Sequence, residues 1–553
     1  MVEVEVYLTK RDGWARICEI RVENRSITTP AVLSLDRERL LDKIDFDLVP
    51  YSLKALDEEK FENLYHEDRN FIVGTGLSVL SPSELVRYLI ELRKKSITKP
   101  LIVTGIATPQ NLPLLCYFGV DVVDNSRVVM AAHEGYYLLE NGFFPVEKLK
   151  ELPCSCKACE KVGSNFAELS RKERIDFLKE HNTLKLQEQA RLLREIIRSE
   201  TLRNFIEARA KTSPDLTVML RRADETDFFE GMYPRFKRSI VYMNTMESFK
   251  RPEVSYFLKR IAEVYRPQTK TALLLPCTAR KPYSLSKTHM KFFNSVGKLV
   301  SFVDEIIISS PLVCPREFEL TYPAQNYDTP VTGVWSDEEI DFVAENLSNL
   351  LAGFEKIIAH VEGGYKRVVE KVREVIESDI VYTSEDGVTS KKSLKNLRRE
   401  LEDEVIEKMT EDKKDKLMAI FSSMFRYQFG LELEEFVEGG KVKIKGRYPN
   451  LELYLKERIL RIDNLYGMLD VDLGLAEDLV KKEVNLVEIG EFEPKGTIFS
   501  AGIIDADKRI RPNDIVFFKN DRFIGVGRAL MSGREMVEAA RGAAIEVKRK
   551  KAL

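Results

Sequence analysis

A short segment near the middle of the chain concentrates residue types that attack carbonyl and nitrile carbons. Residues 276–289 read PCTARKPYSLSKTH, and the apolar run TALLL precedes them directly. Such a run predicts a buried strand, which leaves Cys277 at its carboxyl end, where α/β folds place their active sites. A thiolate is a strong nucleophile, and nearby cations raise the thiolate fraction of a cysteine. The segment therefore predicts a nucleophilic cysteine.

The side chains around Cys277 could supply charge and protons to such a reaction. Arg280, Lys281 and His289 carry or can carry positive charge, and Tyr283 or His289 could move protons. A thiolate that adds to a nitrile gives a thioimidate, and an amine that displaces the thiolate leaves an amidine. The alternative is a nucleotide-binding loop, in which Arg280 and Lys281 contact phosphate and Cys277 forms no covalent bond.

A second polar and aromatic segment follows a predicted strand and could wall the same pocket. Residues 309–335 read SSPLVCPREFELTYPAQNYDTPVTGVW. Glu317, Glu319 and Tyr322 are candidates for orienting a substrate or an incoming amine. The alternative is an ordinary ordered loop.

Three cysteines and one histidine have the spacing of a metal site. The sequence CSCKACE supplies Cys154, Cys156 and Cys159, and His181 follows at the head of a predicted helix. Three thiolates and one imidazole complete a tetrahedral zinc site, and four protein ligands leave no open position. We therefore expect a structural zinc ion. The alternative is three buried cysteines and a surface histidine.

Length and composition limit what the whole chain can be. With 553 residues it is too long for one hydrophobic core. A net charge of −3 excludes a protein that binds polyanions over its whole surface, so any nucleic-acid surface must be local. No apolar run predicts a membrane span, and the first residues lack the pattern of a secretory signal. We expect a cytoplasmic protein, in which clustered cysteines bind metal.

The elements that position these residues fall into four predicted domains. Residues 1–265 alternate strand-like and helical segments, which is typical of an α/β barrel or a doubly wound sheet. Residues 266–395 open a second α/β unit that carries Cys277. Residues 396–485 are charged and mostly helical, with one strand-like piece, GKVKIKGRY. Residues 486–553 are short strands joined by turns, which predicts a small β-rich module.

The last of these modules carries a locally basic surface. Its cations are Arg509, Arg511, Arg528, Arg541, Lys548, Arg549, Lys550 and Lys551. Such a surface suits contacts to phosphates, which position a nucleic acid more than they read its sequence. We expect Arg528, Arg541, Lys548 and Arg549 to bind RNA. The alternative is a basic surface without a ligand.

The cysteine cluster and two further segments resemble the tRNA-guanine transglycosylases. The likeness lies in C-x-C-x2-C with a later His-Asn, in LIVTGIATPQNLPLLCYFGVDVVDNSRVV and in MNTMESFKRPEV. It implies a TIM-barrel-like domain with a zinc insertion over residues 1–265. Asp124 falls at the position of the family's nucleophilic aspartate, but the family's acidic-glycine loop and its Pro-Thr-Arg are not recognisable. Asp124 is therefore expected either to line a pocket for a deazaguanine or to cap a helix.

Residues 276–289 resemble a second family, the archaeosine synthases. Their signature P-C-x3-K-P-Y-x2-S-x2-H is met at Pro276, Cys277, Lys281, Pro282, Tyr283, Ser286 and His289. Residues 501–516, 525–529 and 541–547 resemble a PUA domain. The likeness implies a multidomain α/β protein with an α/β catalytic core, a small α+β linker and a PUA pseudo-barrel. We take Cys277, Lys281, Tyr283, Ser286 and His289 as catalytic candidates. Candidates for substrate binding are Asp124, Arg280 and Glu317.

The resemblance also implies a substrate and partners. The family acts on tRNA that carries 7-cyano-7-deazaguanine in the D-loop, and it adds an amine to the nitrile. Lysine and glutamine both remain open as donors; with lysine, a radical S-adenosylmethionine partner enzyme would cleave the adduct. Transglycosylase relatives often dimerise through the zinc region, so a homodimer is a further expectation. Two alternatives stay open, an active tRNA-guanine transglycosylase that works through Asp124 and a non-catalytic tRNA-binding scaffold.

Overall fold

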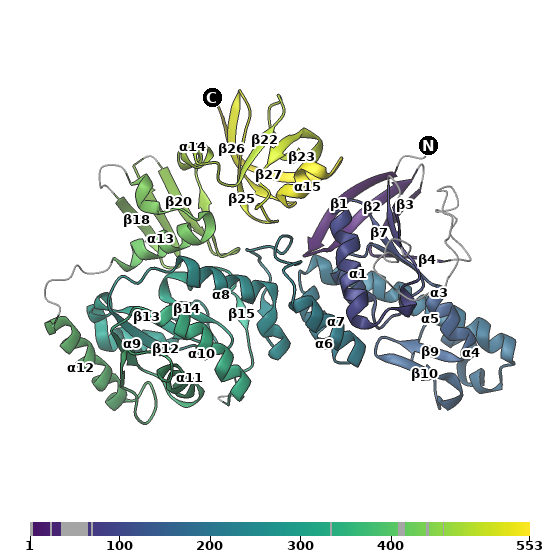
Figure 1. Cartoon of the computed structure of the whole chain (residues 1–553), viewed down its shortest axis with the longest axis horizontal. Coiled ribbons are helices and arrows are strands. Elements are labelled where there is room, and N and C mark those ends of the chain that lie inside the picture. Colours follow the sequence, from purple (N-terminus) through teal and green to yellow (C-terminus); the bar gives the residue numbers. More distant parts are fainter. Residues whose placement is uncertain are drawn as a thin grey trace. The chain divides into compact units, whose positions relative to one another are not determined.

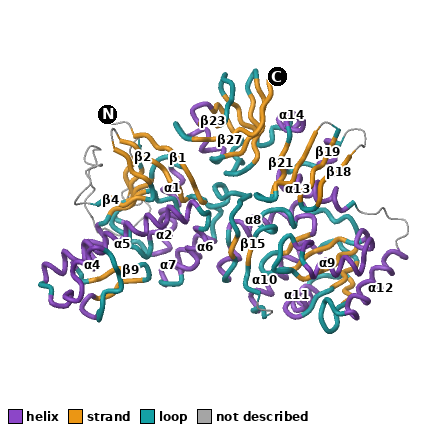
Figure 2. The backbone as a smooth tube through the Cα atoms, turned by 180° about the vertical axis from the view of Figure 1, so that it is seen from behind, coloured by secondary structure: helices purple, strands orange, loops and turns teal. Residues whose placement is uncertain are grey.

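The chain divides into two compact units, each described here by itself. A computed structural model describes residues 4–22, 25–34, 65–67, 70–331, 334–407, 415–437, 442–456 and 458–553. Unit 1 comprises Met1–Tyr233, Thr497–Arg511 and Leu530–Glu546, and unit 2 comprises Pro234–Gly496, Pro512–Ala529 and Val547–Leu553. Figures 1 and 2 show the elements from opposite sides. No helix in the described ranges is long and apolar enough to cross a membrane.

A five-stranded sheet forms the centre of unit 1. Its strand order is β4 (Ala31–Leu33), β8 (Val122–Asp124), β7 (Leu101–Val103), β6 (Ile72–Gly74) and β5 (Tyr65–Glu67). The first four strands are parallel, and β5 pairs antiparallel to β6. Helix α1 (Pro82–Lys95) connects β6 to β7, and α2 (Leu112–Tyr117) connects β7 to β8. The alternating strands and helices follow the pattern seen in the sequence.

The described strands of unit 1 do not close the TIM-barrel-like fold that the resemblance implies. They form an open sheet that ends at the antiparallel strand β5, rather than a ring of eight parallel strands. A strand that runs against its neighbour interrupts the repeat of parallel strand and helix on which a barrel depends. An N-terminal sheet packs beside it, with β1 (Val4–Asp12), β2 (Ala15–Val22) and β3 (Arg25–Thr28) in antiparallel order.

Helices and a hairpin complete unit 1. The helices are α3 (Ser126–His133), α4 (Lys157–Val162), α5 (Arg171–Arg198), α6 (Leu202–Ala210) and α7 (Pro214–Asp224), and the hairpin is β9 (Tyr136–Leu139) with β10 (Gly142–Pro145). The 28-residue helix α5 begins at Ser170, whose side chain accepts from the Glu173 amide while Glu173 reaches back to the Ser170 amide. This reciprocal capping fixes where the longest helix starts.

Unit 2 is built on a sheet with a fully buried central strand. The order is β14 (Val313–Pro315), β13 (Asp304–Ile308), β12 (Thr271–Pro276), β16 (Lys356–Ala359) and β17 (Asp379–Tyr382). All pairs are parallel except that of β14 with β13. Leu273 and Leu275 face one apolar cluster, and Ala272 and Leu274 face another, as the two-residue period of a strand requires. The sheet is therefore covered on both faces.

In the described ranges, five helices pack with this sheet, one that precedes β12 in the chain and four that follow it. They are α8 (Pro252–Val264), α9 (Lys287–Val296), α10 (Asp337–Leu351), α11 (Gly363–Arg373) and α12 (Lys391–Glu407); a short pair, β11 (Val241–Tyr242) with β15 (Tyr327–Asp328), lies beside them. The apolar side chains of α8 belong to the same core cluster as β12. Residues 234–265, which we expected in the first domain, therefore pack in unit 2.

The region after the second sheet contains more β-structure than its charged sequence indicates. Between α13 (Lys416–Phe429) and α14 (Leu473–Lys481) lie four antiparallel strands, β18 (Val442–Arg447), β19 (Asn450–Leu455), β20 (Arg458–Asp463) and β21 (Met468–Val471). Leucines of β19 and β20 belong to the same core cluster as the apolar side chains of α8. We call these four strands the linker sheet.

The C-terminal residues form the small β-rich module that the sequence predicts. Its sheet has the order β23 (Thr497–Phe499), β27 (Ala543–Ala552), β26 (Phe523–Ala529), β25 (Ile515–Lys519), β22 (Leu486–Ile489) and β24 (Ile503–Ala506), and α15 (Gly533–Glu538) precedes β27. Gly525 of β26 lies opposite Phe518, where a Cβ atom would come within 2.2 Å of the phenyl ring. A glycine is needed there so that the ring can cross the strand.

Candidate active site and metal centre

Cys277 lies where the sequence predicts it, directly after the central strand β12 of unit 2. Its amide donates to the Ile308 carbonyl at 2.9 Å, which extends the pairing of β12 with β13 by one residue. The side chain is half-buried, and its Sγ lies 3.2 Å from the hydroxyl oxygen of Tyr365. Tyr365 belongs to the first turn of α11, which follows β16, the other neighbour of β12. A thiol at the carboxyl end of a parallel sheet thus has a hydroxyl within hydrogen-bonding reach.

Packing against Trp335 holds Tyr365 in this place. The two rings meet at 63° with their centroids 4.9 Å apart. The indole also lies against Gly364, where a Cβ atom would come within 2.8 Å of Trp335 Cγ. Only a residue without a side chain allows this approach. Gly364 and Trp335 therefore set the position from which Tyr365 reaches the thiol.

Lys281 is the charged group of this site. Its Nζ lies 3.9 Å above the centre of the Tyr327 ring, a cation–π contact. Burial lowers the pKa of Lys281, while the charges of Cys277 and Asp328 act in the opposite direction. An ammonium group so placed gives up its proton more readily than that of a surface lysine. Lys281 is thus within electrostatic reach of the thiol.

Tyr283, one of the catalytic candidates, has its hydroxyl next to that of a second tyrosine, Tyr327. It is fully buried, and its hydroxyl lies 2.7 Å from that of Tyr327, which in turn lies 2.5 Å from Ser309 Oγ. Burial raises the pKa of Tyr283 well above its usual value. The three hydroxyls form a buried chain that fixes Tyr327 beneath Lys281.

His289, another catalytic candidate, has both ring nitrogens hydrogen-bonded within the fold. Its Nε2–H donates to the Pro276 carbonyl at 3.0 Å, and its Nδ1 accepts from Arg316 at 2.8 Å. Both ring nitrogens are therefore engaged. Burial and then the Arg316 charge lower the pKa of His289 to about 3. The expected proton shuttle is not supported by this geometry, since a neutral ring with two partners inside the fold anchors the residue before Cys277.

Three further candidate residues differ in burial and in role. Ser286 is the N-cap of α9, where its Oγ accepts from the His289 amide at 3.2 Å. Arg280 is exposed, and Glu317 is buried beside Tyr265, whose pKa burial and then Glu317 raise. The structure therefore brings Cys277 and Lys281 together but gives Ser286 a capping role.

A buried ionic network connects the segment around Cys277 to the linker sheet. The Glu319 carboxylate accepts from the Ser284 amide at 3.1 Å and from Arg316 at 3.1 Å, and it also accepts from the Tyr448 hydroxyl at 2.5 Å. Arg316 continues the network to Glu305, at 3.0 Å. Burial opposes ionisation of Glu305, but Lys416 and then Arg316 hold its pKa below the usual range. One carboxylate thus ties the loop before His289 to the turn after β18.

Asp124 is the last residue of β8 in unit 1, and its carboxylate accepts hydrogen bonds from groups of the same unit. It accepts from the Gly105 amide at 2.9 Å and from the Ser126 hydroxyl at 2.9 and 2.8 Å. Burial raises the pKa of Asp124, while these hydrogen bonds act in the opposite direction. The residue joins the end of β8 to the loop after β7, whereas the N-cap of α3 is its neighbour Asn125.

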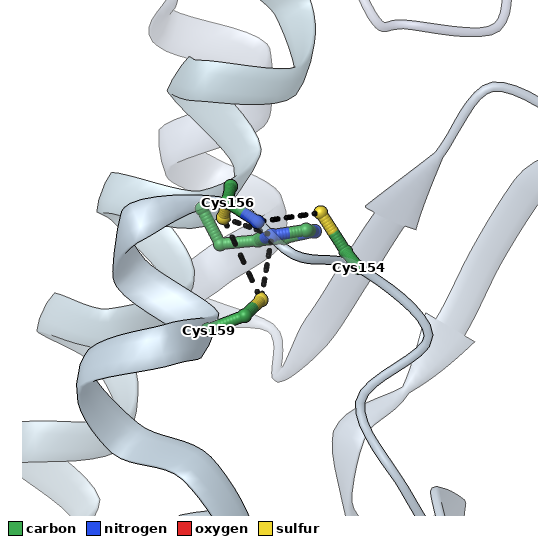
Figure 3. A group of neighbouring side chains, drawn as sticks. Cys154, Cys156 and Cys159 are labelled. Carbon is green, nitrogen blue, oxygen red and sulfur yellow. Dashed lines mark hydrogen bonds between the residues drawn. The ribbon is translucent and has the colours of Figure 1, made fainter.

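The four predicted metal ligands converge in unit 1 (Figure 3). Cys154 and Cys156 precede α4, Cys159 lies on α4 and His181 on α5, and their ligand atoms lie within 4.8 Å of one another. Cys156 Sγ is 3.6 Å from Cys159 Sγ, and the two sulfurs are 3.4 and 3.3 Å from His181 Nδ1. Ligands of a tetrahedral zinc ion lie about 3.8 Å (S···S) and about 3.6 Å (S···N) apart, so the group fits zinc.

Surrounding groups orient this cluster. The His181 Nε2–H donates to the Leu138 carbonyl at 3.0 Å, which leaves Nδ1 free of a proton and directed at the thiols. Burial lowers the pKa of His181 to about 4, so the ring is neutral, the form that binds metal. Tyr137 stacks on the imidazole at 3.7 Å, and its hydroxyl lies 3.2 Å from Cys159 Sγ. A metal held here would pin α4 and the segment before it to α5.

The four cations expected to bind RNA all have partners inside the protein. Lys548 and Arg549 pair with Asp470, at 3.3 Å for the lysine. In unit 2, Arg528 stacks on the Tyr466 ring at 4.7 Å. In unit 1, Arg541 donates to the Tyr7 hydroxyl at 2.9 Å. The basic run at the C-terminus is therefore largely neutralised by the fold.

Comparison with known proteins identifies the family. Residues 44–215 match queuine tRNA-ribosyltransferases, residues 254–401 a domain of unknown function, residues 415–480 a pre-PUA domain and residues 492–551 a PUA domain. Archaeosine synthase subunit alpha of Methanosarcina acetivorans is 36% identical over 515 residues, which are 91% of this chain and 82% of that protein. Archaeosine synthase of Haloferax volcanii is 33% identical over 587 residues, 97% of this chain and 98% of that protein.

The chain belongs to the archaeosine synthase family. A crystal structure of a protein of unknown function is also similar, with 46% identity, a TM-score of 0.46 and coverage of 54% of this chain and 99% of that one. In this member of the archaeosine synthase family, the segment with the signature lies inside the matched domain of unknown function. The expected resemblance to the family is confirmed.

Sequence reasoning missed the two aromatic residues that complete the site of this archaeosine synthase family member. Tyr365 and Trp335 lie far along the chain from Cys277, and neither belongs to the signature. One signal was present in the segment IAHVEGGY, where two glycines come shortly after an apolar run and directly before Tyr365. A glycine pair at a strand end often marks a close approach to a ligand or another side chain.

Proposed function

We propose that this protein adds an amine to the nitrile of 7-cyano-7-deazaguanine in tRNA, as a step of archaeosine biosynthesis. The observation that carries the proposal is the Cys277 thiol at the carboxyl end of β12, 3.2 Å from the Tyr365 hydroxyl. Relatives named archaeosine synthase and the match to queuine tRNA-ribosyltransferases support a tRNA-modifying transferase. The PUA match supports tRNA as the partner.

The first step joins Cys277 to the substrate. The sulfur attacks the nitrile carbon, a C–S bond forms, and one C–N π bond breaks. The thiol proton reaches the nitrile nitrogen through the Tyr365 hydroxyl, so the product is a neutral thioimidate. Lys281 favours the anionic sulfur as the proton leaves. The base must leave its stack in the tRNA for the nitrile to reach the thiol.

The second step releases the enzyme. The amine nitrogen attacks the thioimidate carbon, a C–N bond forms, and the C–S bond breaks. One proton of the amine returns to the sulfur through Tyr365, which restores the thiol and leaves an amidine. No oxidant or reductant is consumed. With lysine as donor the whole amino acid is attached, and a separate radical S-adenosylmethionine enzyme would then cleave it. With glutamine as the source, water hydrolyses its side-chain amide to glutamate and ammonia, and ammonia attacks the thioimidate to give the amidine directly.

The proposal assigns the other parts of the chain supporting roles. The unit 1 sheet descends from a transglycosylase-type TIM barrel and holds the tRNA without exchanging its base, since the Asp124 oxygens are used within the fold. A zinc ion on Cys154, Cys156, Cys159 and His181 stabilises the insertion and takes no part in the reaction. We propose that the protein works in the cytoplasm, as a homodimer joined near this insertion.

Mass spectrometry of tRNA nucleosides tests the function. Transcripts that carry 7-cyano-7-deazaguanine are incubated with lysine or glutamine and with wild-type protein, Cys277→Ala or Cys314→Ala. Cys314 lies fully buried on β14 and serves as the matched control thiol. With wild type and Cys314→Ala only, we expect a mass gain of one whole lysine, or of one ammonia when glutamine is the nitrogen source.

Each other result has a distinct meaning. Release of the deazaguanine base would indicate a transglycosylase that works through Asp124. A mass gain that persists with Cys277→Ala would mean a binding loop without a covalent step. Unchanged nucleosides with either donor, together with tight tRNA binding, would indicate a scaffold.

A further inference from the structure

The linker sheet of unit 2 has one buried face and one open face. Leu451, Leu453 and Leu455 of β19 are at most 3% exposed and pack in the core cluster. The residues between them, Glu452 and Tyr454, are only partly buried and point to the other side. One face of the linker sheet is therefore exposed to solvent, and its side chains take no part in the apolar core.

Three cations occupy the edge of this open face. Lys443, Lys445 and Arg447 alternate along β18, so their side chains lie on the same side, and all three are exposed. They span about 13 Å, since alternate residues of a strand lie about 6.6 Å apart. Strand β18 is the last strand of the sheet on this side. The row is thus a straight, accessible line of positive charge.

The acidic group nearest this row is already used. Glu452 lies opposite Lys445, but it accepts from Arg461 at 2.9 Å and from the Tyr454 hydroxyl at 2.6 Å. Lys445 itself lies 4.2 Å above the Tyr454 ring. In the described ranges no carboxylate pairs with Lys443, Lys445 or Arg447. Their charge is therefore available to a ligand.

The cations at the C-terminus differ from those of β18, because each is paired with a carboxylate. Lys548 and Arg549 pair with Asp470, Lys550 pairs with Glu493 at 2.5 Å, and Lys551 pairs with Glu477. A phosphate would have to displace a carboxylate from each of these cations. On β18 it would displace only water, so phosphate contact is favoured there.

The position of β18 connects the row to the candidate active site. The strand ends at Arg447, and the next residue, Tyr448, donates its hydroxyl proton to Glu319. The same carboxylate accepts from the Ser284 amide in the segment that carries Cys277. A polyanion that follows β18 is therefore guided toward the loop of the candidate nucleophile.

We propose that β18 of the linker sheet binds the phosphate backbone of tRNA through Lys443, Lys445 and Arg447. The identity of the RNA rests on the proposed function, whereas the binding surface rests on the exposed row itself. Contacts of this kind are independent of base sequence, and they position the RNA without selecting it.

Two matched triple variants test the surface by tRNA binding, measured over a range of salt concentrations. One is Lys443→Ala, Lys445→Ala and Arg447→Ala; the other is Lys548→Ala, Arg549→Ala and Lys550→Ala, which removes the same charges. We expect the β18 variant to bind about 100-fold more weakly at 0.15 M salt, with a slope of log Kd against log salt smaller by about 2 to 3. We expect the C-terminal variant to lose less than about 5-fold, because its cations are already paired.

A conservative variant and the modification assay separate the outcomes. Lys443→Arg with Lys445→Arg keeps the charges and should bind tRNA as wild type does. Equal loss in both triple variants, or an unchanged salt slope in the β18 variant, would overturn the proposal. Binding is scored without the reaction, so absence of a nucleoside product with wild type would reject the proposed function and leave the surface standing.

Discussion

The Tyr365 hydroxyl lies 3.2 Å from Cys277 Sγ, although 88 positions separate the two residues in the chain. Strands β12 and β16 pair side by side, and each residue follows one of them. Neighbouring parallel strands end at the same edge of a sheet, so the pairing brings the thiol and the hydroxyl together. In the proposed reaction, this contact allows Tyr365 to carry the proton of the thiol.

Replacing Tyr365 by phenylalanine should slow the reaction without unfolding the protein. The ring keeps its contact with Trp335, while the group that carries the proton is lost, so we expect the single-turnover rate of mass gain to fall about 100-fold. Tyr382→Phe is the control, because its buried hydroxyl has no hydrogen-bond partner in the part of the chain that is described. A Tyr365→Phe rate within a factor of two of wild type would remove Tyr365 from the mechanism.

Gly364→Ala should displace the indole beneath Tyr365. The new Cβ atom would lie 2.8 Å from Trp335 Cγ, so the ring must move. We expect Trp335 emission to shift to longer wavelength, the rate to fall about 10-fold, and stability to fall by about 1–3 kcal/mol. The chain has two tryptophans, so the emission is measured in a Trp14→Phe background. Gly231→Ala, where a Cβ meets open space, should change none of these quantities.

The two buried histidines of unit 2 should make its stability depend on pH. Burial lowers the pKa of His289 to about 3 and that of His360 to about 4. The unfolded chain takes up protons near pH 6.5, so it binds more protons than the folded chain below that pH, and stability falls as pH drops. Each histidine should lower the free energy of unfolding by about 2 kcal/mol between pH 7.5 and pH 5.

Urea denaturation of wild type and His289→Gln at the two pH values isolates one of these contributions. We expect the loss of stability between pH 7.5 and pH 5 to be smaller by about 2 kcal/mol in the variant. An equal loss in both proteins would show that the imidazole is not held neutral by the Pro276 carbonyl and Arg316.

Removing one ligand of the cysteine cluster should release the metal and weaken unit 1. Cys156→Ser replaces a thiolate by a poorer ligand, so we expect zinc content to fall from about one ion per chain to near zero, with a lower thermal midpoint. Elemental analysis and thermal unfolding measure both effects. Cys277→Ser should keep full zinc, and full zinc in Cys156→Ser would contradict the assigned ligands.

Local patterns in the sequence were enough to predict the groups that lie close together along the chain. The apolar run before Cys277 sets its place at a strand end, and the spacing of Cys154, Cys156 and Cys159 indicates the cluster that forms. In both cases the chemistry follows from short segments whose local structure depends little on the rest of the fold.

Roles that depend on long-range contacts could not be predicted in this way. His289 seemed suited to proton transfer, but Arg316, 27 positions away, takes up its Nδ1. Arg549 seemed free for phosphate, but Asp470, 79 positions away, pairs with it. The sequence does not show which strands become neighbours, and that pairing decides whether a charged or titratable group meets a ligand or another side chain.

The Glu319 carboxylate, shared by Ser284 and Tyr448, has a consequence for the history of the chain. Either segment, placed in another protein, would lack the buried acceptor on which its own hydrogen bond depends. Exchange of one segment alone would leave the buried Glu319 carboxylate without one of its hydrogen-bond donors. Such a loss destabilises the core, so chains that carry it are selected against. We therefore expect the stretch from residue 284 to residue 448 to be inherited whole, with gene fusions and fissions in this lineage falling outside it.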